Sequence, residues 1–168
     1  MKKELLIELI PATCFYSNVR SMVSEEVWDK IRYKSYELAN YKCEICGDVG
    51  RNQGHFHNIE CHEIWEYDTT TYTQRLLGLI SLCPKCHQVK HFGRSRILGK
   101  EELCVEHIKK VNGWTNKKLQ KHIDESFELF VNRSKHEWLL DITVLTKDPY
   151  NVKIKLGKRK FKKPKWQK

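Results

Sequence analysis

The chain has 168 residues, 40% of them hydrophobic, which is enough for one hydrophobic core and too few to expect two. The net charge is +10, but the tail at 151–168 holds nine of the 31 Lys and Arg residues and no acid. Residues 1–150 therefore carry 22 basic and 21 acidic side chains, which excludes a uniformly basic body. We predict one domain at 1–150 and a basic tail at 151–168.

The early apolar run at 5–10, LLIELI, contains Glu8 and is followed by Pro11. It is too short and too charged for a signal peptide or a membrane helix, so we expect a cytoplasmic protein with no membrane partner. The seven cysteines, an odd number, favour free thiols and metal ligands over a disulfide framework. Cys14 and Cys104 are expected to be buried as small hydrophobic side chains.

The first predicted helix begins after Ser24, a capping residue followed by two acids, and its apolar face continues to about residue 40. Residues 56–82 are rich in β-forming side chains and are interrupted by a polar stretch at 68–74, which predicts two antiparallel strands. Pro84 suits the first turn of the helix that follows.

Two longer helices are predicted downstream. Apolar side chains along 103–111 form one helix face, which ends at the Asn-Gly pair at 112–113, and Thr115 caps the next helix. A short strand within 138–146 completes an α+β fold in which helices dominate, with a core motif at 41–93 and a helical extension at 100–137. Three histidines on or beside the apolar helix faces are expected to pack there: His107, His122 and His136.

Four cysteines form two Cys-x-x-Cys pairs: Cys43, Cys46, Cys83 and Cys86. The spacing lets both sulfurs of each pair face one ion, and tetrahedral zinc takes four such ligands. We therefore predict a structural zinc site; the alternative is four buried thiols without a metal. The 36 residues between the pairs exceed the loop of a common zinc ribbon, so a further element must lie between them.

The element between the pairs contains the stretch ECHEIWEYD at 60–68. A hairpin held between Cys-x-x-Cys pairs, with a histidine in its first strand and CPKCHQVKH opening the next helix, resembles the HNH nuclease motif, a ββα-metal fold. The segments that extend the resemblance to HNH endonuclease-like proteins of bacteria and phages are WDKIRYKSYELANYKCEICG, ECHEIWEYD, QRLLGLISLCPKCHQVKHFG, VNGW and RSKHEW. The similarity covers about residues 13–145.

The resemblance implies a metal-dependent endonuclease that hydrolyses phosphodiester bonds of nucleic acid, with DNA favoured. In HNH nucleases the histidine of the first strand is the general base, and here that position is His62. The histidine after the last cysteine helps to bind a divalent metal, Mg²⁺ or a transition ion, and here it is His87. His91 lies on the same helix face and is a candidate for metal or phosphate binding. Lys90 is a further candidate phosphate contact.

Two positions differ from the HNH pattern. Cys61 stands where an Asp or His commonly binds the metal, and a thiolate favours zinc over Mg²⁺, so Cys61 and His87 are candidate ligands of a second metal. Gly78 stands where an Asn orients the base. Glu60 and Glu63 could supply the carboxylate that is missing at the position of Cys61. Because a strand turns successive side chains to opposite faces, the cysteine and the histidine beside it share a site only at a bulge or strand end.

The tail offers groups that neutralise phosphates and stack on bases. These candidate nucleic-acid contacts are Lys158, Arg159, Lys160, Lys162, Lys163, Lys165, Phe161 and Trp166. The alternative is a solubilising end that binds nothing specific.

The two departures from the motif leave open a catalytically inactive, zinc-stabilised module that binds DNA, RNA or a ribonucleoprotein. Because residues 1–150 are nearly neutral, a third possibility is a zinc-stabilised adaptor that recognises another protein.

Overall fold

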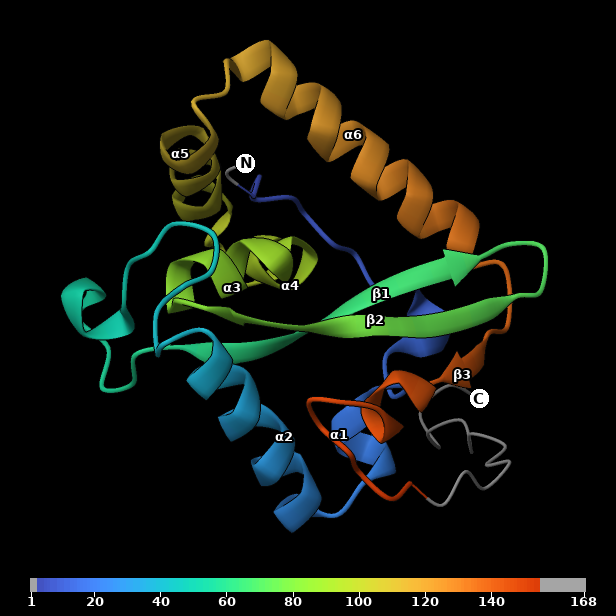
Figure 1. The fold of residues 1–168 in the computed structure, drawn as a ribbon. Coiled ribbons are helices and arrows are strands. Elements are labelled where there is room, and N and C mark those ends of the chain that lie inside the picture. Colours follow the sequence, from blue (N-terminus) through green and yellow to red (C-terminus); the bar gives the residue numbers. More distant parts are fainter. Residues whose placement is uncertain (1–2, 155–168) are drawn as a thin grey trace.

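A β-hairpin lies at the centre of the protein, as seen in a computed structural model that describes residues 3–154 (Figure 1). Its strands β1 (Glu60–Asp68) and β2 (Thr73–Leu82) pair antiparallel, and the short β3 (Leu139–Asp141) pairs parallel with β2. The strand order β1-β2-β3 makes β1 an edge strand of this sheet. The hairpin therefore has one long edge that is open to other parts of the chain or to a ligand.

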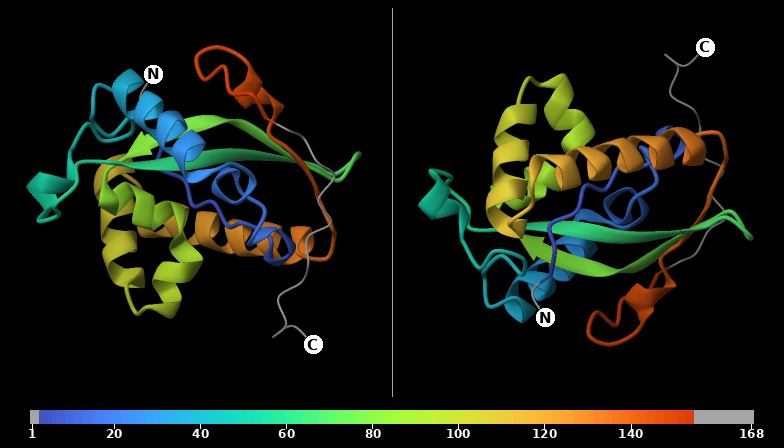
Figure 2. Two further views of the ribbon diagram at one scale, coloured as in Figure 1. Left: turned by 90° about the horizontal axis from the view of Figure 1, so that it is seen from below. Right: turned by 90° about the horizontal axis from the view of Figure 1, so that it is seen from above.

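Helices cover both faces of the hairpin (Figures 1 and 2). One face carries four helices: α3 (Pro84–Lys90), α4 (Phe92–Ile97), α5 (Glu101–Asn112) and α6 (Asn116–Arg133). The other carries α2 (Glu25–Leu38) and the 3₁₀ helix η3 (Thr143–Thr146), while the connections contain η1 (Ala12–Cys14), α1 (Val19–Met22) and η2 (Gly50–Gln53). This arrangement confirms the predicted α+β class. No helix among residues 3–154 is long and apolar enough to cross a membrane.

The predicted helix ends agree with the structure because they depend on local signals. The Ser24 hydroxyl accepts a hydrogen bond from the backbone N–H of Val27, and Thr115 caps α6 in the same way. Gly113 ends α5 with a φ of 67°, a left-handed conformation that favours glycine. The final strand is shorter than predicted, because the carboxylate of Asp141 accepts hydrogen bonds from Thr143 and turns the chain into η3.

Two apolar clusters lie on the two faces of the hairpin. Ile80 and Leu82 of β2 belong to the larger cluster, which includes side chains of α3, α5 and α6. Leu76 belongs to the second cluster with side chains of α2 and η3. Residues that face each other across an antiparallel pair share one face of the sheet. His62 pairs with Ile80, so its ring lies on the side of α3.

The N-terminal segment (residues 3–11) runs between the helices α5 and α6 and the hairpin (Figure 1). Leu5 and Ile7 are buried in the larger cluster. The Asn112 side chain accepts a hydrogen bond from the Leu5 N–H at 2.8 Å and donates one to the Leu5 carbonyl at 2.9 Å. His122 Nε2 accepts a hydrogen bond from the Ile7 N–H at 2.9 Å. These contacts hold the next residue, Glu8, beside the hairpin.

Candidate metal and catalytic site

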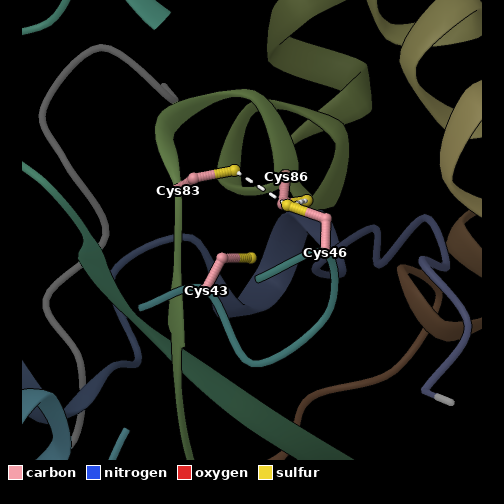
Figure 3. Close-up of side chains that lie close together, drawn as sticks. All are labelled: Cys43, Cys46, Cys83 and Cys86. Carbon is pink, nitrogen blue, oxygen red and sulfur yellow. Dashed lines mark hydrogen bonds between the residues drawn. The ribbon is translucent and has the colours of Figure 1, made fainter. Parts of the chain in front are cut away.

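The four cysteines of the two Cys-x-x-Cys pairs meet at one point between the end of β2 and the loop that follows α2 (Figure 3). All four sulfurs lie within 4.8 Å of one another, and Cys46 Sγ is 3.6 Å from the sulfurs of both Cys83 and Cys86. A zinc–sulfur bond of 2.3 Å in a tetrahedron places sulfurs about 3.8 Å apart. The cluster could therefore hold a metal ion such as zinc.

Two backbone turns orient these sulfurs toward one another. In the first pair, the N–H of Gly47 donates to the carbonyl of Cys43, and a φ of 76° at this glycine closes the turn. In the second pair, Cys83 stands immediately before α3 with Pro84 in the first helical turn, and its carbonyl accepts from the N–H of His87. The same turn thus carries both cysteines of the second pair and His87.

His107 of α5 lies against the cysteine cluster, with its Nε2 3.2 Å from Cys86 Sγ. An imidazole N–H in this position stabilises a metal-bound thiolate from outside the ligand set. The residue pattern predicted only packing for this histidine, because its contact depends on how α5 crosses α3. The two other histidines have different contacts: His122 accepts a hydrogen bond from the N-terminal segment, and His136, which follows α6, packs on Tyr72.

A second cluster is formed by the three histidines of the hairpin and α3. One ring nitrogen from each of His62, His87 and His91 lies within 4.8 Å of the others. The ring centroids are 4.6 to 5.4 Å apart, and the Nε2 atoms of His87 and His91 are separated by 3.1 Å. β1 thus supplies one imidazole, and α3 with the residue after it supplies two.

In two of these rings, one nitrogen contacts a carboxylate. Glu60 Oε2 lies 2.5 Å from Nδ1 of His87, which leaves its Nε2 facing His91. Glu8 Oε2 lies 3.1 Å from Nε2 of His62. An imidazole whose far nitrogen donates to a carboxylate keeps a lone pair on the near nitrogen, an arrangement that metal-binding histidines commonly show.

Burial keeps two of the imidazoles neutral. It lowers the pKa of His91 to about 3, with the nearby rings acting in the same direction. Burial also lowers the pKa of His62, although the hydrogen bond to Glu8 opposes the change. Neutral imidazoles can bind a metal or accept a proton. Imidazole nitrogens suit a transition ion such as zinc better than Mg²⁺, which prefers oxygen ligands.

The two glutamates that contact the cluster are stabilised in their ionised form. The hydrogen bond with His87 is the main cause of a lowered pKa of Glu60. For Glu8, burial acts to raise the pKa, but the hydrogen bond to His62 and the charge of Lys90 outweigh it and the pKa lies below the ordinary value. Both carboxylates are therefore charged at neutral pH.

Cys61 and Glu63 are directed away from the histidine cluster, as the alternation of a strand requires. Cys61 pairs with Ser81, on the side of α2, and burial raises the pKa of its thiol to about 12. Glu63 Oε1 accepts a hydrogen bond from the Val19 N–H at 2.8 Å. The structure therefore does not bring Cys61 together with His87 as a ligand pair.

The remaining predicted site residues lie in different surroundings. Lys90 is buried and its ammonium group pairs with Glu8, so it contacts a carboxylate of the protein rather than solvent. Gly78 lies opposite Ile64, and a side chain built there would meet no atom within 4 Å. The candidate contacts of the tail, from Lys158 to Trp166, lie outside the described residues.

The partner of His62 could not have been found from the motif alone. Glu8 precedes it by 54 positions and belongs to an apolar run with no recognisable site pattern. Comparison with protein-family models, with curated proteins and with solved structures finds no match to this chain.

Proposed function

We propose that this protein is an HNH-like metal-dependent endonuclease that hydrolyses phosphodiester bonds of nucleic acid, with DNA as the favoured substrate. The observation that carries the proposal is the meeting of His62, from the first strand of a hairpin, with His87 and His91 from the helix that follows. Strand, strand and helix stand in the order that the ββα-metal motif requires. A metal ligand set and a proton acceptor thus lie side by side.

His62 acts as the general base. Its Nε2 is held by the Glu8 carboxylate, so Nδ1 is the nitrogen that takes a proton from the attacking water. The carboxylate keeps the ring oriented and stabilises the imidazolium that forms, as the acid of a catalytic triad does. Glu8 thereby takes the role that an Asn has in the HNH motif, where this chain has Gly78.

His87 and His91 would hold the divalent metal through their Nε2 atoms, which face each other. A metal bound there supplies Lewis-acid stabilisation of the charge that develops on the phosphate. Glu60 fixes the ring of His87 from the outer side. A zinc ion held by the four cysteines would anchor the first turn of α3 and would thereby position His87, which lies next to Cys86 in the sequence.

Nicking assays test this proposal directly. Supercoiled plasmid and single-stranded circular DNA are incubated with the protein and Mg²⁺, Mn²⁺, Ni²⁺ or Zn²⁺. We expect cleavage with at least one transition ion, and we expect His62→Ala to lower the rate by about 100-fold or more. His136→Ala, an exposed histidine away from the cluster, is the matched control. Equal rates in wild type and His62→Ala would exclude the assigned base.

A second candidate is a catalytically inactive, zinc-stabilised module that binds nucleic acid. It is favoured by the position of the Cys61 thiol on the far side of β1 and by the missing side chain at Gly78. This function predicts binding that falls steeply with salt and on removal of residues 151–168. Equal binding by wild type and His62→Ala, with no cleavage under any metal, would select it over the enzyme.

A further inference from the structure

A groove of about 660 Å³ opens beside the histidine cluster. It follows the edge strand β1, and all three histidines line it together with residues of the N-terminal segment, α1, α2, α4 and α6. Its volume is in the range of pockets that hold small ligands. A group bound in the groove would therefore lie next to the proposed catalytic atoms.

Aromatic side chains form much of the wall of this groove: Phe15, Trp28, Trp65, Phe127 and Phe130. The rings of Phe15 and Phe130 are stacked, with centroids 6.5 Å apart and planes 18° from parallel. Phe15 is 53% exposed, so part of its ring remains accessible to a ligand in the groove. An accessible aromatic face in a groove suits a flat ring that stacks on it.

Cationic side chains border the same groove. Arg20 and Arg94 are exposed, and within residues 3–154 neither forms an ion pair with a carboxylate. Arg96 differs, because it pairs with Glu101 and lies 4.5 Å from the ring centre of Phe127. Guanidinium groups without a carboxylate partner bind phosphate in a fixed geometry. The groove thus combines surfaces for planar rings with charges for an anionic backbone.

We propose that this groove binds unpaired nucleobases, so that the substrate class of the site is single-stranded or locally unpaired nucleic acid. The bases stack on Phe15 and its neighbours, while the backbone passes Arg94 toward the histidines. A base in an intact duplex is already stacked and paired, and it cannot enter a pocket of this size without leaving the helix. The inference rests on the proposed function for the histidines but concerns a different set of atoms.

Binding measurements without cleavage test the groove separately from the chemistry. The probes are a fluorescein-labelled oligothymidylate of about 12 nucleotides and an abasic strand with the same number of phosphates. No divalent metal is added to the purified protein. Since stacking contributes per base, we expect the strand with bases to bind at least about tenfold more tightly than the abasic strand.

Four variants test where the preference for bases arises. Phe15→Leu and Phe130→Ala each remove one ring of the stacked pair, and we expect each to reduce the ratio of the two affinities severalfold. Arg94→Ala should weaken both strands equally, because phosphates are common to them. Tyr33→Ala is the matched control, since this ring is 51% exposed on α2 and does not line the groove.

The outcomes distinguish base binding in the groove from base binding by the tail and from catalysis. Equal affinity for the two strands would overturn the proposal. A preference for bases that survives in both Phe15→Leu and Phe130→Ala would also overturn it, because the preference would then arise elsewhere, for instance at Phe161 and Trp166. A preference that these variants remove would support the groove even if no metal supports cleavage, in which case only the proposed hydrolysis fails.

Discussion

The carboxylate of Glu8 lies 3.1 Å from Nε2 of His62, which follows it by 54 positions in the chain. The other oxygen of this carboxylate pairs with the ammonium group of Lys90. A residue of the N-terminal segment therefore joins the strand that carries the proposed base to the helix that carries the proposed metal ligands. This link makes Glu8 the residue on which base orientation and packing both depend.

Replacing Glu8 with glutamine should lower the rate of the proposed reaction. The amide keeps the size of the side chain but removes the charge that stabilises a protonated His62, and loss of such an outer partner typically costs 10- to 100-fold. We expect kcat to fall by about this factor while KM changes little. Steady-state nicking measurements on an oligonucleotide substrate check this result.

Glu4→Gln is the matched control for Glu8→Gln. Glu4 belongs to the same segment, but it binds Trp114 and Lys118 rather than a histidine of the cluster. This variant should retain the kcat of the wild type. If both variants lose activity equally, the effect comes from loosening the segment, and the orienting role of Glu8 is excluded.

Removal of the Glu8 carboxylate should also destabilise the fold, because Lys90 would remain charged in a buried position. The Lys90 side chain is 6% exposed. Leaving one partner of a buried ion pair alone costs several kcal/mol, so we expect Glu8→Ala to lower the free energy of unfolding by about 2–4 kcal/mol. Denaturant titration measures this loss.

The double variant Glu8→Ala/Lys90→Met separates the charge from the packing. It removes the unpaired ammonium group and retains an apolar side chain of similar length, so it should recover most of the stability that Glu8→Ala loses. Activity should stay low, because His62 still lacks its partner. A double variant no more stable than Glu8→Ala would show that burial of Lys90 is not the cause.

Much of the fold follows from signals that act within a few residues. Ser24, Thr115 and Gly113 mark helix ends through hydrogen bonds or backbone conformations that their own neighbours complete. The two Cys-x-x-Cys pairs predict the cysteine cluster because each pair is already a chelating unit. The position of Cys61 on the far face of β1 follows from strand alternation alone.

The contacts that complete the two clusters have no such local signal. Glu8 lies in a run that looks like any buried apolar segment, and its place beside His62 depends on Asn112 and His122 of two distant helices. The contact of His107 with Cys86 depends on the crossing of α3 and α5. Tertiary packing creates both contacts, so residue spacing could not predict them.

The contact between His107 and Cys86 predicts a loss of metal affinity in His107→Ala. The imidazole lies 3.2 Å from the sulfur, and removing a hydrogen bond to a metal-bound thiolate typically weakens metal binding 10- to 100-fold. Competition with a chromophoric zinc chelator measures the affinity. Cys61→Ser is the control, because its thiol lies outside the cysteine cluster and the zinc content should stay unchanged. Loss of zinc in Cys61→Ser would contradict the assigned ligand set.

We expect Glu63 to make the free energy of unfolding depend on pH, because burial raises the pKa of this carboxyl from 4.5 to about 7. Between these two values the folded protein holds a proton that the unfolded chain has released. The contribution of Glu63 to stability is therefore fully present below pH 4.5 and is lost as the pH rises through 7. The shift corresponds to about 3 kcal/mol between these limits.

The variant Glu63→Gln removes this dependence, since an amide does not ionise and its oxygen can still accept the hydrogen bond from Val19. The free energy of unfolding of Glu63→Gln, relative to the wild type, should therefore rise between pH 5 and pH 8. Denaturant titrations at both values measure the difference, with Glu66→Gln of the same strand as the control. A relative stability of Glu63→Gln that is constant with pH would mean that Glu63 ionises normally in the folded protein.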